Sequence, residues 1–129
     1  MASRSVVFLD THILIWLYDA LIDKLSVKAQ TLLESSELKI SPMVLLELNY
    51  LFEIERITEP PSVIYQSLNQ SLRLAVDNTD FLSIIHHTYA LTWTRDPFDR
   101  IIVAHAMGFK AQLITADRLI QKHYPLSLC

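Results

Sequence analysis

Arg95-Asp96-Pro97-Phe98-Asp99-Arg100-Ile101-Ile102-Val103-Ala104-His105-Ala106 is the stretch that decides the fold. Asp96 followed by proline predicts a helix start, because aspartate accepts bonds from first-turn amides and the fixed φ of proline suits the first helical position. The residues after Asp99 are apolar around most of the helix, which predicts burial. Asp99 then lies in the first turn, where the helix dipole favours an ionised carboxylate.

The length of the chain predicts one domain over residues 1–129 with a single sizeable core. Gly108 is the only glycine, so a Walker loop or a glycine-rich dinucleotide turn is excluded. The formal charge of −3 argues against a polybasic nucleic-acid coat, although local basic patches are compatible with it.

Cysteine usage and the first apolar run both bear on the compartment. The lone Cys129 excludes an intramolecular disulfide and fits a reducing environment. Asp10, His12 and Asp19 interrupt the first apolar run, so neither a signal peptide nor a membrane span is predicted. We therefore expect a soluble protein in the cytoplasm.

Short apolar runs alternate with helical patterns along the chain, which predicts an α/β fold with a mainly parallel sheet. Strands are expected at residues 6–9, 38–40, 74–76 and 112–115, with an edge strand at 126–128. Helices are expected at 13–18, 26–36, 42–56, 62–72, 79 or 80 to 91, 96–108, and between 117 and 125. Ser62 is expected to cap the fourth of these helices, and Gly108 to stop the sixth.

Acidic residues recur where such a sheet forms its sites, beyond the carboxyl ends of the strands. Asp10 directly follows the first strand, and Asp117 comes two residues after the strand that ends at Thr115. Glu47 lies in an apolar stripe of its helix, where an uncompensated carboxylate is costly. With Asp99 these residues make a possible quartet.

Four carboxylates in one place would repel each other, and some would have to take up protons at neutral pH. A divalent cation removes that problem. Oxygen ligands without a histidine or cysteine cluster favour Mg²⁺ or Mn²⁺ over Zn²⁺. The chemistry that follows most naturally is metal-assisted phosphodiester hydrolysis.

Each aspartate also has a structural explanation. Asp10 and Asp117 could cap the helices that follow them, and Asp96 is assigned mainly to capping. Asp99 could simply be an acid that stabilises the helix dipole. His105 lies on another face of the helix from Asp99 and is interpreted as a core or interface residue.

The remaining polar candidates stay open at this point. Glu47 could form a buried ion pair with Arg95 or Arg100. Arg100 could instead contact phosphate or neutralise the acids, and a solvated role is equally open. Thr115 could orient a neighbouring carboxylate or a metal-bound water, and His12 could touch substrate.

Several motifs follow one another along nearly the whole chain: Leu9-Asp10-Thr11-His12, Ser41-Pro42 with Glu47-Leu48, Arg95 to Ala104, Leu113-Ile114-Thr115-Ala116-Asp117, and His123-Tyr124-Pro125. In this order they resemble the PIN-domain ribonucleases, and specifically the VapC-type toxins of type II toxin–antitoxin pairs. The Asp-Pro-Phe-Asp-Arg block, together with the other acids, is the specific part of the resemblance. The closing Leu-Ser-Leu-Cys differs from the usual end of that subgroup.

The resemblance implies a PIN-like three-layer α/β/α fold. It also implies that Asp10, Glu47, Asp99 and Asp117 hold Mg²⁺ or Mn²⁺ and cleave single-stranded RNA. A homodimer and a cognate antitoxin that blocks the acidic pocket are implied as partners. These partner statements rest on the resemblance alone.

The leading hypothesis is a metal-dependent endoribonuclease in which Asp10 and Asp99 are the principal metal ligands. A phosphatase that forms an aspartyl-phosphate on Asp10 is a weaker alternative, since His12 stands where such enzymes place a second aspartate. A third hypothesis is a catalytically silent PIN-like module that acts only by binding protein.

Overall fold

A central parallel sheet organises the computed structural model, which describes residues 4–129. Strand β1 (Val6–Leu9) lies in the middle, and the strand order is β3-β2-β1-β4-β5 with every neighbouring pair parallel. The other strands are β2 (Glu37–Ile40), β3 (Ala75–Val76), β4 (Gln112–Ile114) and β5 (Ser127–Leu128). The predicted α/β fold is confirmed, including the edge strand at the end of the chain.

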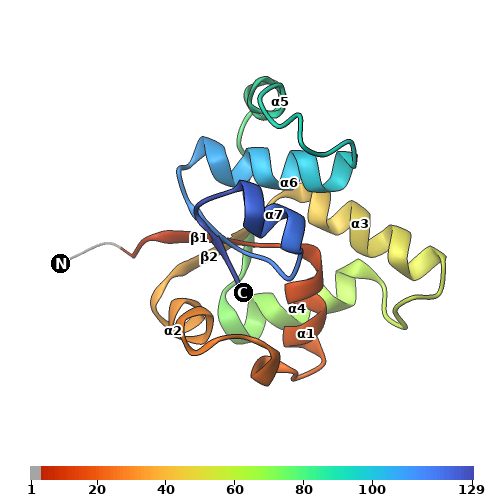
Figure 1. The fold of residues 1–129 in the computed structure, drawn as a ribbon. Helices are drawn as coiled ribbons and strands as arrows, with labels where there is room; N and C mark the ends of the chain where they lie inside the picture. The colour runs from red at the N-terminus through yellow and green to blue at the C-terminus, as the bar shows by residue number, and fades with distance from the viewer. Residues whose placement is uncertain (1–3) are drawn as a thin grey trace.

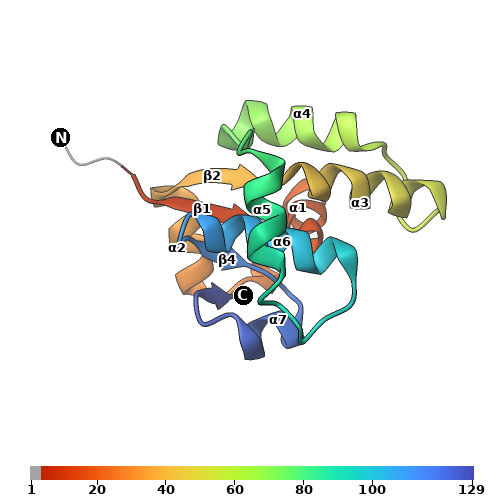
Figure 2. The ribbon, with the colours of Figure 1, turned by 90° about the horizontal axis from the view of Figure 1, so that it is seen from above.

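Helices cover both faces of this sheet, as expected for a three-layer fold (Figure 1). Figure 1 shows α5 and α6 on one side of β1 and α1, α2 and α4 on the other, while α3 and α4 extend past the end of the sheet in Figure 2. No helix within residues 4–129 is long and apolar enough to cross a bilayer. The helices are α1 (Thr11–Tyr18), the 3₁₀ turn η1 (Ile22–Lys24), α2 (Val27–Ser35), α3 (Pro42–Glu53), α4 (Pro61–Leu72), α5 (Phe81–Thr88), α6 (Pro97–Gly108) and α7 (Arg118–His123).

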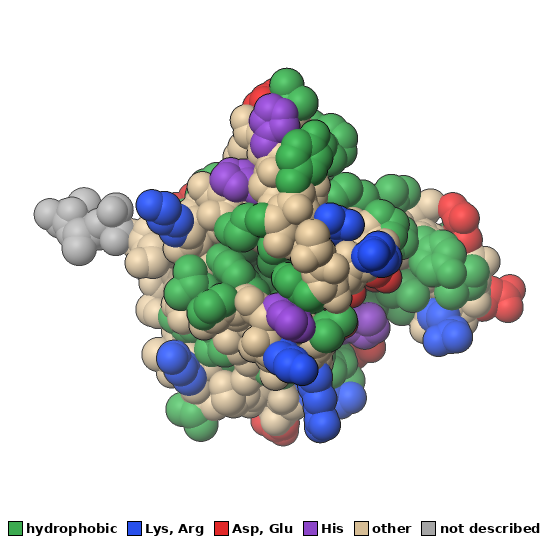
Figure 3. All heavy atoms as spheres, turned by 45° about the horizontal axis from the view of Figure 1, so that its top comes forward, with side chains coloured by type: hydrophobic (Ala, Val, Ile, Leu, Met, Phe, Trp, Pro, Cys, Tyr) green, Lys and Arg blue, Asp and Glu red, His purple; other side chains and the backbone are tan. Residues whose placement is uncertain are grey.

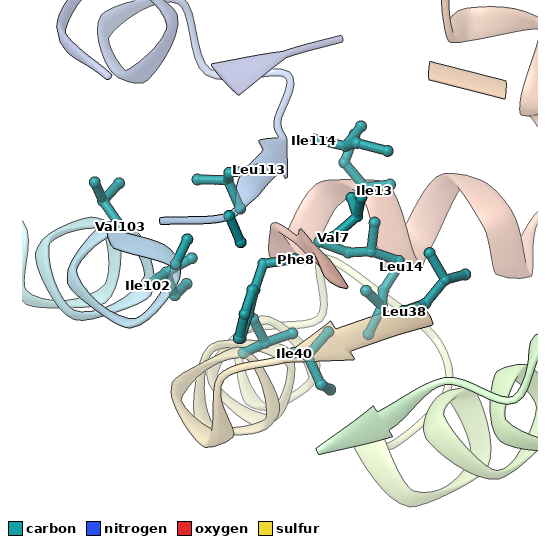
Figure 4. Close-up of a cluster of buried hydrophobic side chains, with 14 of the residues drawn as sticks. Val7, Phe8, Ile13, Leu14, Leu38, Ile40, Ile102, Val103, Leu113 and Ile114 are labelled. Carbon is teal, nitrogen blue, oxygen red and sulfur yellow. The ribbon is translucent and has the colours of Figure 1, made fainter. Parts of the chain in front are cut away.

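The core forms on both faces of β1, which explains why that strand is a continuous apolar run. Successive side chains of a strand point to opposite faces. In Figure 4, Val7 lies beside Ile13 of α1, while Phe8 lies on the side of Ile102. The stretch that begins at Asp96 is buried as predicted, with Ile102 to Ala106 almost fully inaccessible.

Residues other than glycine adopt left-handed backbone conformations at the ends of two helices. Helix α3 ends at Glu53 rather than near residue 56, since Glu55 has φ 62° and the Arg56 amide bonds back to the Leu51 carbonyl at 2.8 Å. Helix α6 ends at Gly108 as predicted, but the left-handed turn after it is made by Lys110, with φ 51°, and not by the glycine.

Two other helix boundaries were also predicted wrongly. Helix α4 begins at Pro61, so Ser62 lies inside the helix, and the capping residue Pro60 makes no side-chain bond. Proline suits the first turn without such a bond, because it has no amide to satisfy there. Helix α5 ends at Thr88 rather than at Leu91, and Asp80 is its cap.

The packing of the core predicts a large effect of truncating Leu113, which is fully buried in β4. Leu113→Ala should lower the free energy of unfolding by about 2–5 kcal/mol, since it leaves a cavity between the helical layers. Val27→Ala is the control, because Val27 is 80% exposed on α2, and it should change stability by less than about 0.5 kcal/mol. Urea denaturation measures both, and equal losses would contradict a close-packed sheet.

Candidate active site

Asp10 stands at the carboxyl end of β1 and is 4% exposed. Its two carboxylate oxygens are held separately: the Thr11 amide donates to Oδ1 at 2.7 Å, and the Thr115 hydroxyl donates to Oδ2 at 2.6 Å. Burial raises the pKa of Asp10 above its ordinary value despite these two bonds. Asp10 therefore caps α1, as the structural explanation proposed, and lies in the predicted cluster as well.

Asp117 is positioned by the segment that leaves β4. The Thr115 hydroxyl, which donates to Asp10, also accepts the Asp117 amide at 3.1 Å. The Asp117 Oδ1 atom accepts the amides of Leu119 at 2.8 Å and Ile120 at 3.1 Å, so Asp117 caps α7. Thr115 thus connects two acids that lie 107 positions apart in the chain.

Asp96 and Asp99 enter the site together at the start of α6. The Asp96 Oδ1 atom accepts the amides of Phe98 at 2.8 Å and Asp99 at 3.2 Å, which confirms the predicted cap. The Asp96 amide in turn donates to the Thr94 hydroxyl at 3.2 Å. This cap holds Asp99, which is half-buried, in the first turn of the helix.

Glu47 reaches the site from α3 and is also half-buried. Its carboxylate accepts a short hydrogen bond from the Thr11 hydroxyl, so the residue after Asp10 connects α3 to the end of β1. Burial, and after it the charge of Asp10, raises the pKa of Glu47. Thr11 is a site residue that the sequence pattern did not predict, although its hydroxyl directly after Asp10 was a signal for it.

Repulsion between the acids shows that the structure brings the quartet together. Burial raises the pKa of Asp99 to about 7, and the negative charges of Asp10, Asp96, Asp117 and Glu47 add to that shift. Three of these charges lie at the starts of α1, α6 and α7, where the helix dipoles partly offset the repulsion. Carboxylates from four separate segments thus share one electrostatic environment.

No basic side chain neutralises this quartet within residues 4–129. The ion pairs there join Lys39 to Glu37 and Asp77, and His105 to Asp77. The structural alternative for Glu47, a buried pair with an arginine, is therefore wrong. The Arg100 Nε atom donates to the Thr88 carbonyl at 3.1 Å, and the exposed His12 lies close enough to lower the pKa values of Asp10 and Glu47 slightly.

The donor set suits a hard dication. Within the described part of the chain, no three histidine, cysteine or acidic side chains converge closely enough to ligate one ion. Mg²⁺ does not need such a triad, because it is usually held by one or two carboxylates and keeps several waters. A dication would also relieve the repulsion that raises the pKa of Asp99. The residues present therefore fit Mg²⁺ or Mn²⁺.

Comparison with known proteins agrees with this fold. The PIN domain family model matches residues 7–124, a range that includes the whole quartet. The chain therefore belongs to the PIN-domain family. No curated protein resembles the sequence closely enough to count as a match.

Two solved structures share the fold over nearly their whole length. One is the complex of VapBC2 from Rickettsia felis bound to a DNA fragment from its promoter, with 19% identity, a TM-score of 0.67, and 95% of this chain and 96% of that chain covered. The other is a toxin–antitoxin complex from Klebsiella pneumoniae, with 21% identity, a TM-score of 0.65 and the same coverage. At these identities the matches show the fold alone.

The raised pKa of Asp99 predicts a pH-dependent stability in the absence of divalent metal. The ordinary pKa of aspartate is 3.8, whereas Asp99 in the folded protein titrates at about 7. Between these values the folded protein holds a proton that the unfolded chain has lost, so the free energy of unfolding should fall as pH rises from about 4 to 7. Urea denaturation in chelator across this range measures the effect.

Asp99→Asn is the matched variant for this measurement, because it removes the carboxylate and keeps the shape of the side chain. Its unfolding free energy should fall less steeply than that of the parent over the same pH range. If the unfolding free energies of the two proteins fall equally with pH, the pKa of Asp99 is not raised in the folded protein.

Proposed function

We propose that this chain, as one PIN domain over residues 1–129, is a metal-dependent endoribonuclease that hydrolyses phosphodiester bonds of single-stranded RNA. The observation that carries the proposal is a cluster of four carboxylates without a neutralising cation among residues 4–129, in which burial and the charge of other members raise the pKa values of three, Asp10, Glu47 and Asp99. Such a cluster is costly unless a divalent ion completes it.

Asp10 and Asp99 are the proposed principal ligands of Mg²⁺ or Mn²⁺, while Glu47 and Asp117 complete the shell by holding waters of the ion and orient the attacking water. When bound, the ion would supply a hydroxide nucleophile at neutral pH and stabilise charge on the leaving oxygen. Thr115 supports the site by fixing the Asp10 carboxylate, and the Asp96 cap holds the helix turn that carries Asp99.

Two other polar side chains have proposed roles beside the quartet. His12 is exposed and near the acids, so it is placed to contact the RNA. Arg100 is half-buried and held through its Nε atom, and we propose that its guanidinium group helps to neutralise phosphate at the edge of the site.

The sequence disfavours an aspartyl-phosphate phosphatase. Such enzymes place a second aspartate two residues after the nucleophile, and His12 stands at that position after Asp10. The silent-module alternative is tested by metal binding: calorimetry with Mn²⁺ should show binding to the parent and weaker binding to Glu47→Gln. A parent protein that binds no Mn²⁺ would favour the module.

The ribonuclease proposal predicts that Asp99→Asn loses cleavage of single-stranded RNA by about a hundredfold or more. The reason is that a metal ion contributes several kcal/mol of charge stabilisation, and each 1.36 kcal/mol is a factor of ten in rate. The measurement is cleavage-site mapping on total RNA with Mg²⁺. Chelator should abolish the parent's cleavage, and added Mg²⁺ or Mn²⁺ should restore it.

Asp80→Asn is the control for that experiment, since Asp80 caps α5 outside the quartet and should keep parental activity. A parent protein that leaves RNA intact with either metal would overturn the ribonuclease assignment. So would an Asp99→Asn variant that cuts as well as the parent.

We further propose that the chain is the toxin of a type II toxin–antitoxin pair, located in the cytoplasm, with an antitoxin that blocks the acidic site. The support is that both structural neighbours come from toxin–antitoxin complexes.

We also propose a homodimer that uses helix α5. The side chains of Phe81 and Leu82 on α5, and of Tyr89 directly after it, are each at least 60% exposed, and α5 projects from the molecule in Figure 1.

The dimer proposal predicts that Phe81→Asp converts the protein to a monomer. Burying an unpaired charge in an apolar interface costs several kcal/mol, enough to weaken association at least a hundredfold. Light scattering after size-exclusion chromatography measures the mass. Val27→Asp replaces an apolar residue on α2 that is more exposed than Phe81, 80% against 61%, and should leave the mass unchanged. A parent that is already monomeric would contradict the proposal.

A further inference from the structure

Two aromatic rings that the site described above does not use stack on each other at its edge. Trp93 lies in the segment before α6, and His123 is the last residue of α7. Their ring centroids are 4.9 Å apart and their planes differ by 7°. Trp93 is half-buried and His123 is exposed, so the pair lies at the surface with the tryptophan as its inner member.

The two helices next to this pair begin at the acids. Trp93 precedes the α6 cap Asp96 by three residues, and His123 follows the α7 cap Asp117 by six. Asp117 contributes to the raised pKa of Asp99, so the starts of these helices lie close together. Six helical residues span about 9 Å, which sets the approximate distance along α7 from its acid to the ring pair.

Positive charge also surrounds the pair. Arg95, Arg118 and Lys122 are all exposed and lie next to the two rings or the two acids in the sequence. Figure 3 shows Lys and Arg side chains gathered over α7 and over the beginning of α6 on one face of the molecule. Single-strand binding sites combine this kind of basic surface with aromatic rings on which bases stack.

We propose that the Trp93–His123 pair is a base-stacking platform for the RNA, a proposal that rests on the proposed function. One nucleobase of the single strand packs on the exposed face of the His123 ring, with the Trp93 ring behind it. A stacked strand advances about 3.4 Å per nucleotide, so about 9 Å places this base two or three nucleotides from the phosphate at the carboxylates. Because stacking accepts any base, the platform sets the path of the strand rather than its sequence.

The test is a double-mutant cycle between the protein and the strand. Binding is measured by fluorescence anisotropy at low ionic strength, in the Asp99→Asn background with Mg²⁺ so that the strand stays intact. The probes are an oligoadenylate of about ten nucleotides and an abasic ribose-phosphate strand of the same length. The abasic strand keeps every phosphate and removes every stacking face.

His123→Ala should weaken binding of the oligoadenylate about five- to 150-fold and should leave binding of the abasic strand nearly unchanged. His123→Phe keeps a flat ring without the imidazole and should retain most of the affinity for the oligoadenylate. His86→Ala removes another exposed histidine, which lies on α5 with its ring centroid 5.7 Å from that of Tyr89, and should bind both strands as the background protein does.

Tryptophan fluorescence gives an independent measure, because the chain has only Trp16 and Trp93. In a Trp16→Phe variant of the same background, the oligoadenylate should quench or shift the Trp93 emission, whereas the abasic strand should not. Emission that responds equally to both strands would contradict a base stacked on this pair.

The remaining outcomes separate the platform from the ribonuclease proposal. If the parent cleaves RNA but His123→Ala weakens both strands equally, the platform is wrong and the ribonuclease assignment stands. The same holds if the protein binds the abasic strand as tightly as the oligoadenylate. A protein that neither binds strands nor cleaves RNA would overturn both proposals.

Discussion

Repulsion between carboxylates at the carboxyl edge of one parallel sheet is the constraint on which the rest of this structure depends. The acids are held in place by hydrogen bonds rather than by opposite charges. Thr11 and Thr115 fix Asp10, and first-turn amides fix Asp96 and Asp117. Because this framework does not neutralise the acids, burial and then the neighbouring negative charges raise the pKa of Asp99.

Asp77 shows that the same chain can neutralise a buried acid. It follows β3 and is 7% exposed. Burial alone would raise the pKa of Asp77, but hydrogen bonds from the Thr79 hydroxyl, from His105 at 2.7 Å and from Lys39 at 3.2 Å hold it well below its ordinary value. The lack of such partners at the quartet is therefore a local property of that site, and it is what a cation-binding site requires.

Local sequence signals predicted most of the helices and strands, because each signal depends only on residues that are neighbours in the chain. Ser41-Pro42 and Asp96-Pro97 marked the starts of α3 and α6, and His105 lies in the core as expected. Helix ends were harder to predict. Glu55 and Lys110 adopt the left-handed backbone conformation that glycine usually supplies at a helix end, so no glycine at these positions marks the turn in the sequence.

The candidate site was predictable as a set of residue types, because the order of strands in a parallel sheet determines which loops meet. The hydrogen bonds within the site were not predictable from the sequence. The contact between Asp10 and Thr115 joins the first strand to the fourth, and the bond from Thr11 to Glu47 crosses from α1 to α3. The Trp93–His123 stack likewise depends on where α7 ends relative to the segment before α6. Such contacts depend on how the helices and strands pack against each other, and patterns of neighbouring residues do not reveal that packing.

Capping and metal binding are compatible roles for these aspartates, although they were weighed as alternatives from the sequence. The two amide bonds of Asp96 both go to Oδ1, and so do those of Asp117, while Oδ2 of each makes no hydrogen bond within residues 4–129. An ionised carboxylate offers about four lone-pair sites, so Asp10 also retains acceptor capacity beside its two bonds. The cap fixes the direction of the carboxylate, and the remaining oxygen capacity is left for a cation or a water. Three helices begin at this one edge of the sheet, and their first turns hold the acids in fixed positions there.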